Sequence, residues 1–148
     1  MAEFIHDDNA DFHLRKIQKP MVCPEEGSFI GWKCGYYYDK IVNFGYPFRL
    51  TPMAIIKLEI PADAKRSSGF GRKCRCNKAK VLSIKNIIGE PIKGAHSFYD
   101  NSFIYEVGET VSVPDFCENR WQECAPGIHF FMTEEEAVSY MNVMRGIQ

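Results

Sequence analysis

Short apolar stretches separated by turn residues dominate the middle of the chain. The clearest is Met53–Ile60, in which Ile56, Leu58 and Ile60 alternate with charged residues. Alternation with a period of two places the apolar side chains on one face, so this stretch predicts a half-buried β-strand. Pro61 ends the predicted strand, because proline has no N–H to donate to a neighbouring strand.

Other stretches of similar character are also predicted to be strands. They are rich in aromatic and β-branched residues and are bounded by glycine or proline. These predicted strands are Ser28–Cys34, Tyr36–Val42, Val81–Ile88, Phe103–Val107 and Gly127–Met132. Gly35 separates the first two, which suggests a tight turn at that glycine.

The end of the chain has the period of a helix instead. Thr133 and Glu136 form a capping box, Thr-Glu-Glu-Glu, which is typical of a helix start. The residues that recur on one helical face are Ala137, Tyr140, Met141 and Met144. The whole pattern predicts an α+β fold, a mainly antiparallel β-sheet with a C-terminal helix packed on it.

Composition is that of a globular domain. The chain has 148 residues, of which 45% are hydrophobic and 14% aromatic. That apolar content is enough to form a single core and excludes a disordered chain. Residues 1–20 are polar and end at Pro20, so we expect an N-terminal arm followed by one domain at residues 21–148.

The cellular compartment is inferred from two kinds of segment that the sequence lacks. No run of about 18 apolar residues is present, so we expect no membrane partner. The first residues are too acidic for a signal peptide, which favours a cytoplasmic protein. In a reducing cytoplasm the six cysteines are expected to remain free thiols.

The strongest functional signal is the segment KRSSGFGRKCRCNKAK at residues 65–80. It carries seven cations and no acid in a chain of net charge −1, which predicts a local positive field. Glycines let successive backbone N–H groups converge on an anion, and arginine can hold phosphate oxygens bidentately. We therefore predict a phosphate-binding surface, with Phe70 available to stack on a base. Its predicted residues are Lys65, Arg66, Ser67, Ser68, Gly69, Gly71, Arg72, Lys73 and Arg75.

The same segment also fits a solvated β-hairpin whose lysines protect a sheet edge from aggregation. If residues 72–77 are extended, the two cysteines face inward while Lys73, Arg75 and Asn77 form an outward ridge. A P-loop is excluded because its Gly-x-x-x-x-Gly-Lys-[Ser/Thr] spacing is missing.

Cysteine and histidine spacing gives weaker signals. Cys124 and His129 are five residues apart, which suggests either a thiol–imidazole pair or a histidine packed in the core. Neither Cys74-x-Cys76 nor the separation of Cys117 from Cys124 fits a usual zinc site. We therefore predict no metal site and no cofactor.

Two further patterns leave alternatives open. Trp32 and the tyrosines at 36–38 are suited either to stacking on a nucleobase or to cross-strand packing. Residues 127–130, Gly-Ile-His-Phe, are similar to a Gly-Ile-Tyr-Phe strand of some ADP-ribosyltransferases. Glu134 and Glu136 have the spacing of the Glu-x-Glu motif of those enzymes, but here they are expected to cap a helix.

Several phrases in a fixed order resemble a known domain family. They are Pro-Glu-Glu-Gly-Ser-Phe-Ile-Gly-Trp-Lys at 24–33, Ile-Pro-Ala-Asp-Ala-Lys-Arg-Ser-Ser at 60–68, Gly-Arg-Lys-Cys-Arg at 71–75, Tyr-Glu-Val-Gly-Glu at 105–109 and Glu-Cys-Ala-Pro-Gly-Ile-His-Phe-Phe at 123–131. The order resembles a family of unassigned function in phages and giant viruses, sometimes found after pentapeptide repeats, and covers about residues 21–141. The resemblance implies a viral or mobile-element setting, and hence the cytoplasm of a host cell. It implies no reaction.

Three functional hypotheses follow. The first is a non-enzymatic binder of a phosphorylated ligand, which in a viral setting suggests sequestration of a host immune nucleotide signal. The second is an enzyme acting on a nucleotide, with Cys124, His129 or Glu109 as candidate groups. The third is a protein-interaction module that inhibits a host defence factor. A homo-oligomer with a shared cleft is compatible with each of them.

Overall fold

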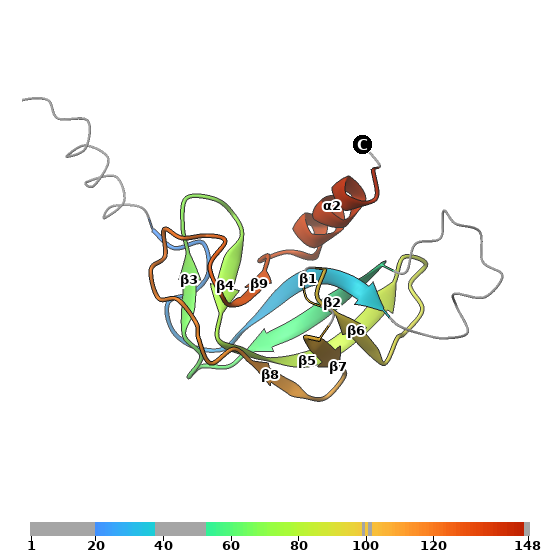
Figure 1. Cartoon of the computed structure of the whole chain (residues 1–148), viewed down its shortest axis with the longest axis horizontal. Helices are drawn as coiled ribbons and strands as arrows, with labels where there is room; N and C mark the ends of the chain where they lie inside the picture. Colours follow the sequence, from blue (N-terminus) through green and yellow to red (C-terminus); the bar gives the residue numbers. More distant parts are fainter. Residues whose placement is uncertain (1–19, 38–52, 99, 101, 147–148) are drawn as a thin grey trace, which may run out of the picture.

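The computed structural model describes residues 20–37, 53–98, 100 and 102–146. Within them, two antiparallel β-sheets carry one helix, α2 (Glu134–Met144) (Figure 1). The large sheet has the order β7-β6-β1-β2-β5-β8 and the small sheet the order β3-β4-β9. The strands are β1 (Phe29–Tyr37), β2 (Met53–Ile60), β3 (Arg66–Ser68), β4 (Cys74–Cys76), β5 (Lys78–Asn86), β6 (Gly94–His96), β7 (Ile104–Glu106), β8 (Thr110–Ser112) and β9 (Ile128–Phe130).

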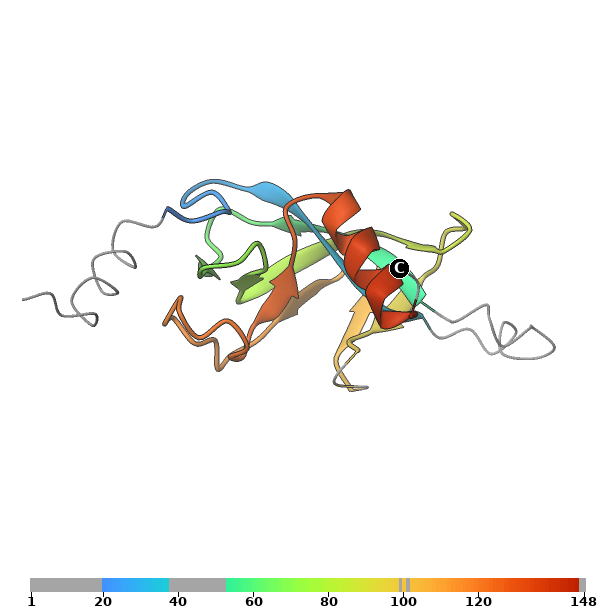
Figure 2. The same cartoon turned by 90° about the horizontal axis from the view of Figure 1, so that it is seen from above.

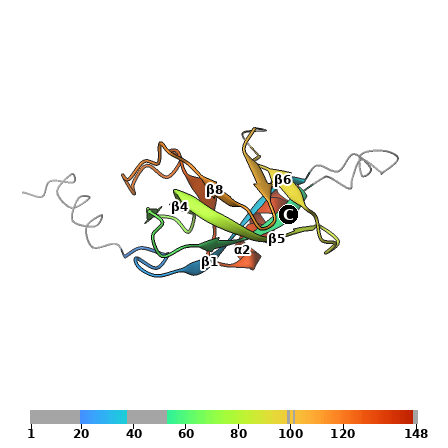
Figure 3. The same cartoon turned by 90° about the horizontal axis from the view of Figure 1, so that it is seen from below.

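The helix covers one face of the large sheet. α2 packs on β1 and β2, and Figure 2 shows it lying across these strands. In the opposite view the strands lie in front of the helix (Figure 3). This arrangement confirms the predicted α+β class, an antiparallel sheet with the C-terminal helix packed on it. The boundary between the predicted arm and the domain stays a prediction, because residues 1–19 lie outside the described residues.

β1 differs from the prediction at Gly35. The strand runs without interruption from Phe29 to Tyr37, and Gly35 pairs with Ala54 of β2. Gly35 is not among the glycines with positive φ, so the predicted tight turn is wrong. The absence of a side chain serves close packing there instead of a turn. The remainder of the second predicted strand, residues 38–42, lies outside the described residues.

The main core lies on the face of the large sheet that is turned away from α2. The side chains of Ile56, Leu58 and Ile60 are fully buried there, as the alternation in β2 predicts. A smaller cluster beneath the helix contains Cys34, Met53 and Met141. The odd-numbered positions of β1 face the core and its even-numbered positions face the helix side, which decides where each β1 side chain can act.

The start of α2 has the predicted capping box. The Thr133 hydroxyl accepts from the Glu136 N–H at 3.2 Å, and the Glu136 carboxylate accepts from the Thr133 N–H at 3.2 Å. We expect Thr133→Ala to lower the free energy of unfolding by about 1 kcal/mol, since one helix N–H loses its acceptor. Urea denaturation measures this. Thr133→Ser, which keeps the hydroxyl, is the control, and an equal loss in both variants would contradict the capping role.

None of the helices in the described ranges is long and apolar enough to cross a membrane. All six cysteines lie within those ranges as free thiols, four of them buried.

Candidate functional site

The two arginines expected to hold phosphate at the start and middle of the basic segment are bound to the protein itself. The Arg66 side chain donates to the backbone carbonyls of Pro24, Gly27, Pro61, Ala62 and Ala64. Arg75 is only 2% exposed, so the predicted outward ridge is wrong at this residue. The reason is that the loop between β8 and β9 covers that face of β4. The guanidinium of Arg75 donates to the carbonyls of Cys117, Pro126 and Asn119 at 2.8, 2.9 and 3.0 Å.

Other groups of the segment also lie within the protein or have partners in it. The two serines, Ser67 and Ser68, are 3% and 2% exposed. The Gly71 N–H donates to the Glu123 carboxylate at 3.0 Å, so the glycine loop already holds an anion of the protein.

Carboxylates from distant parts of the chain also meet two of the segment's cations. Arg72 pairs with Glu136 at 2.8 Å, which holds the pKa of that carboxyl below its usual range, and Lys65 pairs with Glu118 at 3.3 Å. The charge that looked uncompensated is therefore partly met, and phosphate binding at this surface stays a prediction.

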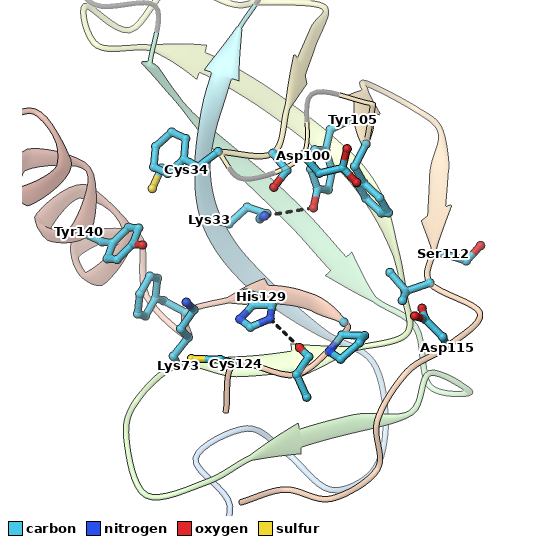
Figure 4. Close-up of a pocket in the computed structure, with 18 of the residues that line it drawn as sticks. Lys33, Cys34, Lys73, Asp100, Tyr105, Ser112, Asp115, Cys124, His129 and Tyr140 are labelled. Carbon is cyan, nitrogen blue, oxygen red and sulfur yellow. Dashed lines mark hydrogen bonds between the residues drawn. The ribbon is translucent and has the colours of Figure 1, made fainter. Parts of the chain in front are cut away.

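A cavity of about 720 Å³ lies beside the small sheet, next to β1 and β9. Its walls come from β1, β9, the segment after β6, the loop before β9 and α2 (Figure 4). We call it the fork cavity, because β1 exchanges one neighbouring strand for another beside it. The lining residues that bear on its chemistry are Lys33, Cys34, Lys73, Phe98, Tyr105 and His129.

The fork arises along the outer edge of β1. Trp32 exchanges backbone hydrogen bonds with Phe131, immediately after β9, at 2.8 and 2.6 Å. Four residues along, Tyr36 pairs with His96 of β6. Between these two pairs, neither β9 nor β6 pairs with the outer edge of β1. The cavity opens at that gap.

Two glycines allow both neighbours to approach β1 closely. A Cβ atom at Gly31 would lie 2.6 Å from the ring of Phe130, and one at Gly35 would lie 2.6 Å from the carbonyl oxygen of His96. Both distances are too short for any side chain to be accepted without movement. The sequence Gly-Trp-Lys-Cys-Gly thus places Lys33 on the core face between two positions at which neighbouring atoms lie close to the β1 backbone.

Lys33 brings a positive charge into this gap. The residue is 9% exposed, and its ammonium group donates to the Tyr105 hydroxyl at 3.0 Å. The ammonium nitrogen also lies 4.7 Å from the centre of the Tyr105 ring. Among the described residues no carboxylate lies within 4 Å of it, although Asp100 and Asp115 line the same cavity. An ammonium has three N–H donors, and two of these have no acceptor in the described part of the chain.

The neighbouring thiols do not supply the missing negative charge. Burial raises the pKa of Cys34 to about 11 and that of Cys76 to about 12, so both are neutral at pH 7. Burying an ammonium without a counter-charge costs free energy, and proteins normally avoid it. The position of the Lys33 ammonium is therefore not explained by its contacts within the described residues.

A second ammonium and an aromatic wall complete the cavity. Lys73 comes from the basic segment, and its ammonium nitrogen lies 5.6 Å from the centre of the Tyr140 ring. Phe98 stacks on Tyr140 at 22° with the ring centres 6.3 Å apart, and Phe131 contacts the same tyrosine. The structure thus joins two lysines, 40 positions apart in sequence, beside a flat apolar surface.

His129 and Cys124 line the same cavity, as the enzymatic hypothesis requires. His129 Nε2 lies 3.0 Å from the carbonyl oxygen of Ala125 and therefore carries the proton. Its buried Nδ1 has no partner among the described residues. Burial, with Lys73 as the next contribution, lowers the pKa of His129 to about 4, so the ring is neutral at pH 7. No hydrogen bond links this ring to the Cys124 thiol in the described structure.

Since the folded pKa of His129 is about 4 and its ordinary value is 6.5, the unfolded chain binds more protons between these pH values. The free energy of unfolding is therefore not reduced by this group above pH 6.5, and it falls as the pH falls towards 4. Between pH 7 and pH 4.5 we expect a loss of about 2 kcal/mol from this group. His129→Gln keeps a donor for the Ala125 carbonyl but does not titrate, and urea denaturation should show a smaller loss in that variant. Equal losses would show that the pKa of His129 is not lowered in the folded protein.

The other predicted features lie elsewhere. Trp32 lies beneath the Lys57 ammonium, and Tyr36 packs against His96 and Phe98, whereas Tyr38 is outside the described residues. Glu134 and Glu136 belong to the first turn of α2, as expected from the capping box. In the described ranges no three His, Cys, Asp or Glu side chains gather in a way that could hold a metal ion.

Comparison with known proteins identifies the family of this chain but no activity. Residues 19–137 match the model of a family of unknown function, DUF5758. An uncharacterised protein, L223 of Acanthamoeba polyphaga mimivirus, is 36% identical over 101 residues. The aligned region covers 61% of this chain and 64% of L223, which is less than two thirds of that relative. No solved structure matches the chain. The predicted giant-virus resemblance is confirmed, while the association with pentapeptide repeats stays a prediction.

Proposed function

We propose that this chain, which belongs to the family of unknown function DUF5758, binds a phosphorylated small molecule in the fork cavity. The observation that carries the proposal is Lys33, a buried ammonium with no carboxylate partner in the described structure. A phosphate group would supply both the negative charge and the acceptors that its two remaining N–H groups lack.

Charge and size support a phosphorylated ligand. Lys33 and Lys73 bring two positive charges to the cavity, which Asp100 and Asp115 also line, and a phosphate monoester carries a charge of about −2 at pH 7. The volume of about 720 Å³ lies in the range of about 300–1,000 Å³ that is usual for small-molecule sites. Lys73 belongs to the basic segment, so the proposal retains one predicted cation and moves the centre of the site to β1.

The proposal is for binding without reaction. His129 is neutral at pH 7, but its Nε2 proton is engaged by a backbone carbonyl and its Nδ1 is buried. Because Cys124 lines the same cavity, a hydrolase or transferase acting on the ligand is the second candidate. Sequestration of a host nucleotide signal, expected from the viral resemblance, is the biological form of the first candidate.

A thermal-shift screen tests the proposal. The compounds are sugar phosphates, nucleoside mono- and diphosphates, cyclic oligonucleotides and, for each, the dephosphorylated or carboxylate analogue. We expect phosphorylated compounds to raise the melting temperature, because a ligand that binds the folded state stabilises it. Their dephosphorylated analogues should not raise it, because they lack the group that Lys33 is proposed to bind. Ligand recovered intact after denaturation supports binding, and converted ligand supports the enzyme. No shift with any phosphorylated compound would overturn the proposal.

A further inference from the structure

The gap in the fork exposes a backbone donor and acceptor as well as the lysine. In an antiparallel strand, the N–H and C=O groups of one residue point to the same edge, and those of the next residue to the opposite edge. Trp32 and Tyr36 use their outer groups on Phe131 and His96. Cys34 lies midway between them in an unbroken register with β2, so its N–H and C=O also point outward into the gap.

Both neighbours that could pair with Cys34 have moved away from it. Continuing the pairing of Tyr36 with His96 would place Phe98 opposite Cys34, and continuing that of Trp32 with Phe131 would place His129 there. Neither pairing forms, and both residues line the cavity instead. The Cys34 N–H and C=O therefore have no hydrogen-bond partner among the described residues.

This unpaired state is unusual for such a buried residue. Cys34 is 6% exposed, and more than about 90% of buried backbone polar groups in proteins are hydrogen-bonded. Its side chain packs toward α2, with Met141, so the backbone is what this residue presents at the strand edge (Figure 4). Lys33, the preceding residue, directs its ammonium toward Tyr105 on the core face.

We infer that the ligand carries a nucleobase, which pairs through a neighbouring donor and acceptor with the backbone of Cys34 and stacks against Phe98. The inference rests on the proposed function, since it assigns the part of the ligand that is not phosphate. A peptide is disfavoured because strands on both sides of Cys34 leave one residue of free edge. The Phe98–Tyr140 pair provides the flat surface that a base requires.

Binding affinities test the inference. The probes are ribose 5-phosphate and the four common nucleoside 5′-monophosphates, which share the sugar phosphate and differ by the base. Two backbone hydrogen bonds and one stacking contact predict that at least one nucleotide binds about tenfold or more tightly than ribose 5-phosphate. Equal affinity for ribose 5-phosphate and all four nucleotides would overturn the inference and leave the proposed function intact.

Amide hydrogen exchange locates the contact in the wild-type protein. Without ligand, the Cys34 amide should exchange faster than those of Lys33 and Gly35, whose N–H groups face β2. The tightest-binding nucleotide should slow exchange at Cys34 by tenfold or more, whereas ribose 5-phosphate should not. Cys34→Pro removes the outward N–H without removing a bond to β2 and should lower nucleotide affinity toward that of ribose 5-phosphate. Nucleotide binding with no added protection at Cys34 would overturn the inference even if the proline variant does not fold.

Discussion

Lys33→Met should lower the affinity for the tightest-binding phosphorylated compound by about 100-fold, or roughly 3 kcal/mol. The substitution removes the ammonium and leaves the bound phosphate without that buried charge partner. Methionine has nearly the length and volume of lysine, so packing beside Tyr105 is retained. The free energy of unfolding should stay the same or rise, because an unpaired buried ammonium is no longer present in the ligand-free protein. Calorimetric titration and urea denaturation measure the two quantities.

Lys57→Met is the matched control. Lys57 lies on the neighbouring strand, opposite Trp32 in the register, and faces away from the core side that Lys33 occupies. It does not line the fork cavity. Its substitution should leave ligand affinity within about twofold of the wild type, a difference of roughly 0.4 kcal/mol. If both variants lose affinity equally, the effect is one of overall charge and not of the cavity.

Arg75→Met should lower the free energy of unfolding by about 3–5 kcal/mol. The substitution leaves the carbonyls of Cys117, Asn119 and Pro126, which are partly buried, without the donors that the guanidinium now provides. These carbonyls belong to the loop that links β8 to β9, so the arginine fixes this loop on β4. Since a domain of this size has a total stability of about 5–15 kcal/mol, the variant should be close to unfolding at 37 °C.

Arg72→Met is the control for this substitution. Arg72 belongs to the same basic segment, but its side chain is 60% exposed and it pairs with Glu136 at the surface. Exposed ion pairs contribute little to folding, so its stability in urea should be close to that of the wild type. If the two arginines prove equally dispensable, the structural role assigned to Arg75 is wrong.

The fold could be predicted from the sequence because its signals are local. Alternation in β2 and the capping box before α2 each depend on residues within one element, and both are present in the structure. The tight turn predicted at Gly35 is wrong for a physical reason. A glycine in a strand indicates either a turn or a close approach, and only the neighbouring strand, here β6 with the His96 carbonyl, decides between them.

The candidate site was harder to predict because the sequence shows which charges are neighbours along the chain but not which charges lie close together in the folded protein. The basic segment looked free of acids, yet Glu136, Glu123 and Glu118 reach it from positions 53 to 71 residues away from its first residue. One signal for Lys33 was present in the sequence. It lies in an apolar strand between Gly31 and Gly35 and shares their face, so a charge was directed at the core. The missing partners of Cys34 depend on where two other strands end, which no local pattern reveals.

Lysine side-chain NMR locates the bound phosphate most directly. The protein is labelled with ¹⁵N at the lysine Nζ atoms, assigned with Lys33→Met and Lys73→Met, and titrated with a phosphorylated compound that raises its melting temperature. We predict that the Lys33 and Lys73 signals shift most, while those of Lys65 and Lys78, which pair with Glu118 and Asp63, hardly move. Shifts at Lys65 and Lys78 with a stationary Lys33 signal would place the ligand on the basic segment and contradict binding in the fork cavity.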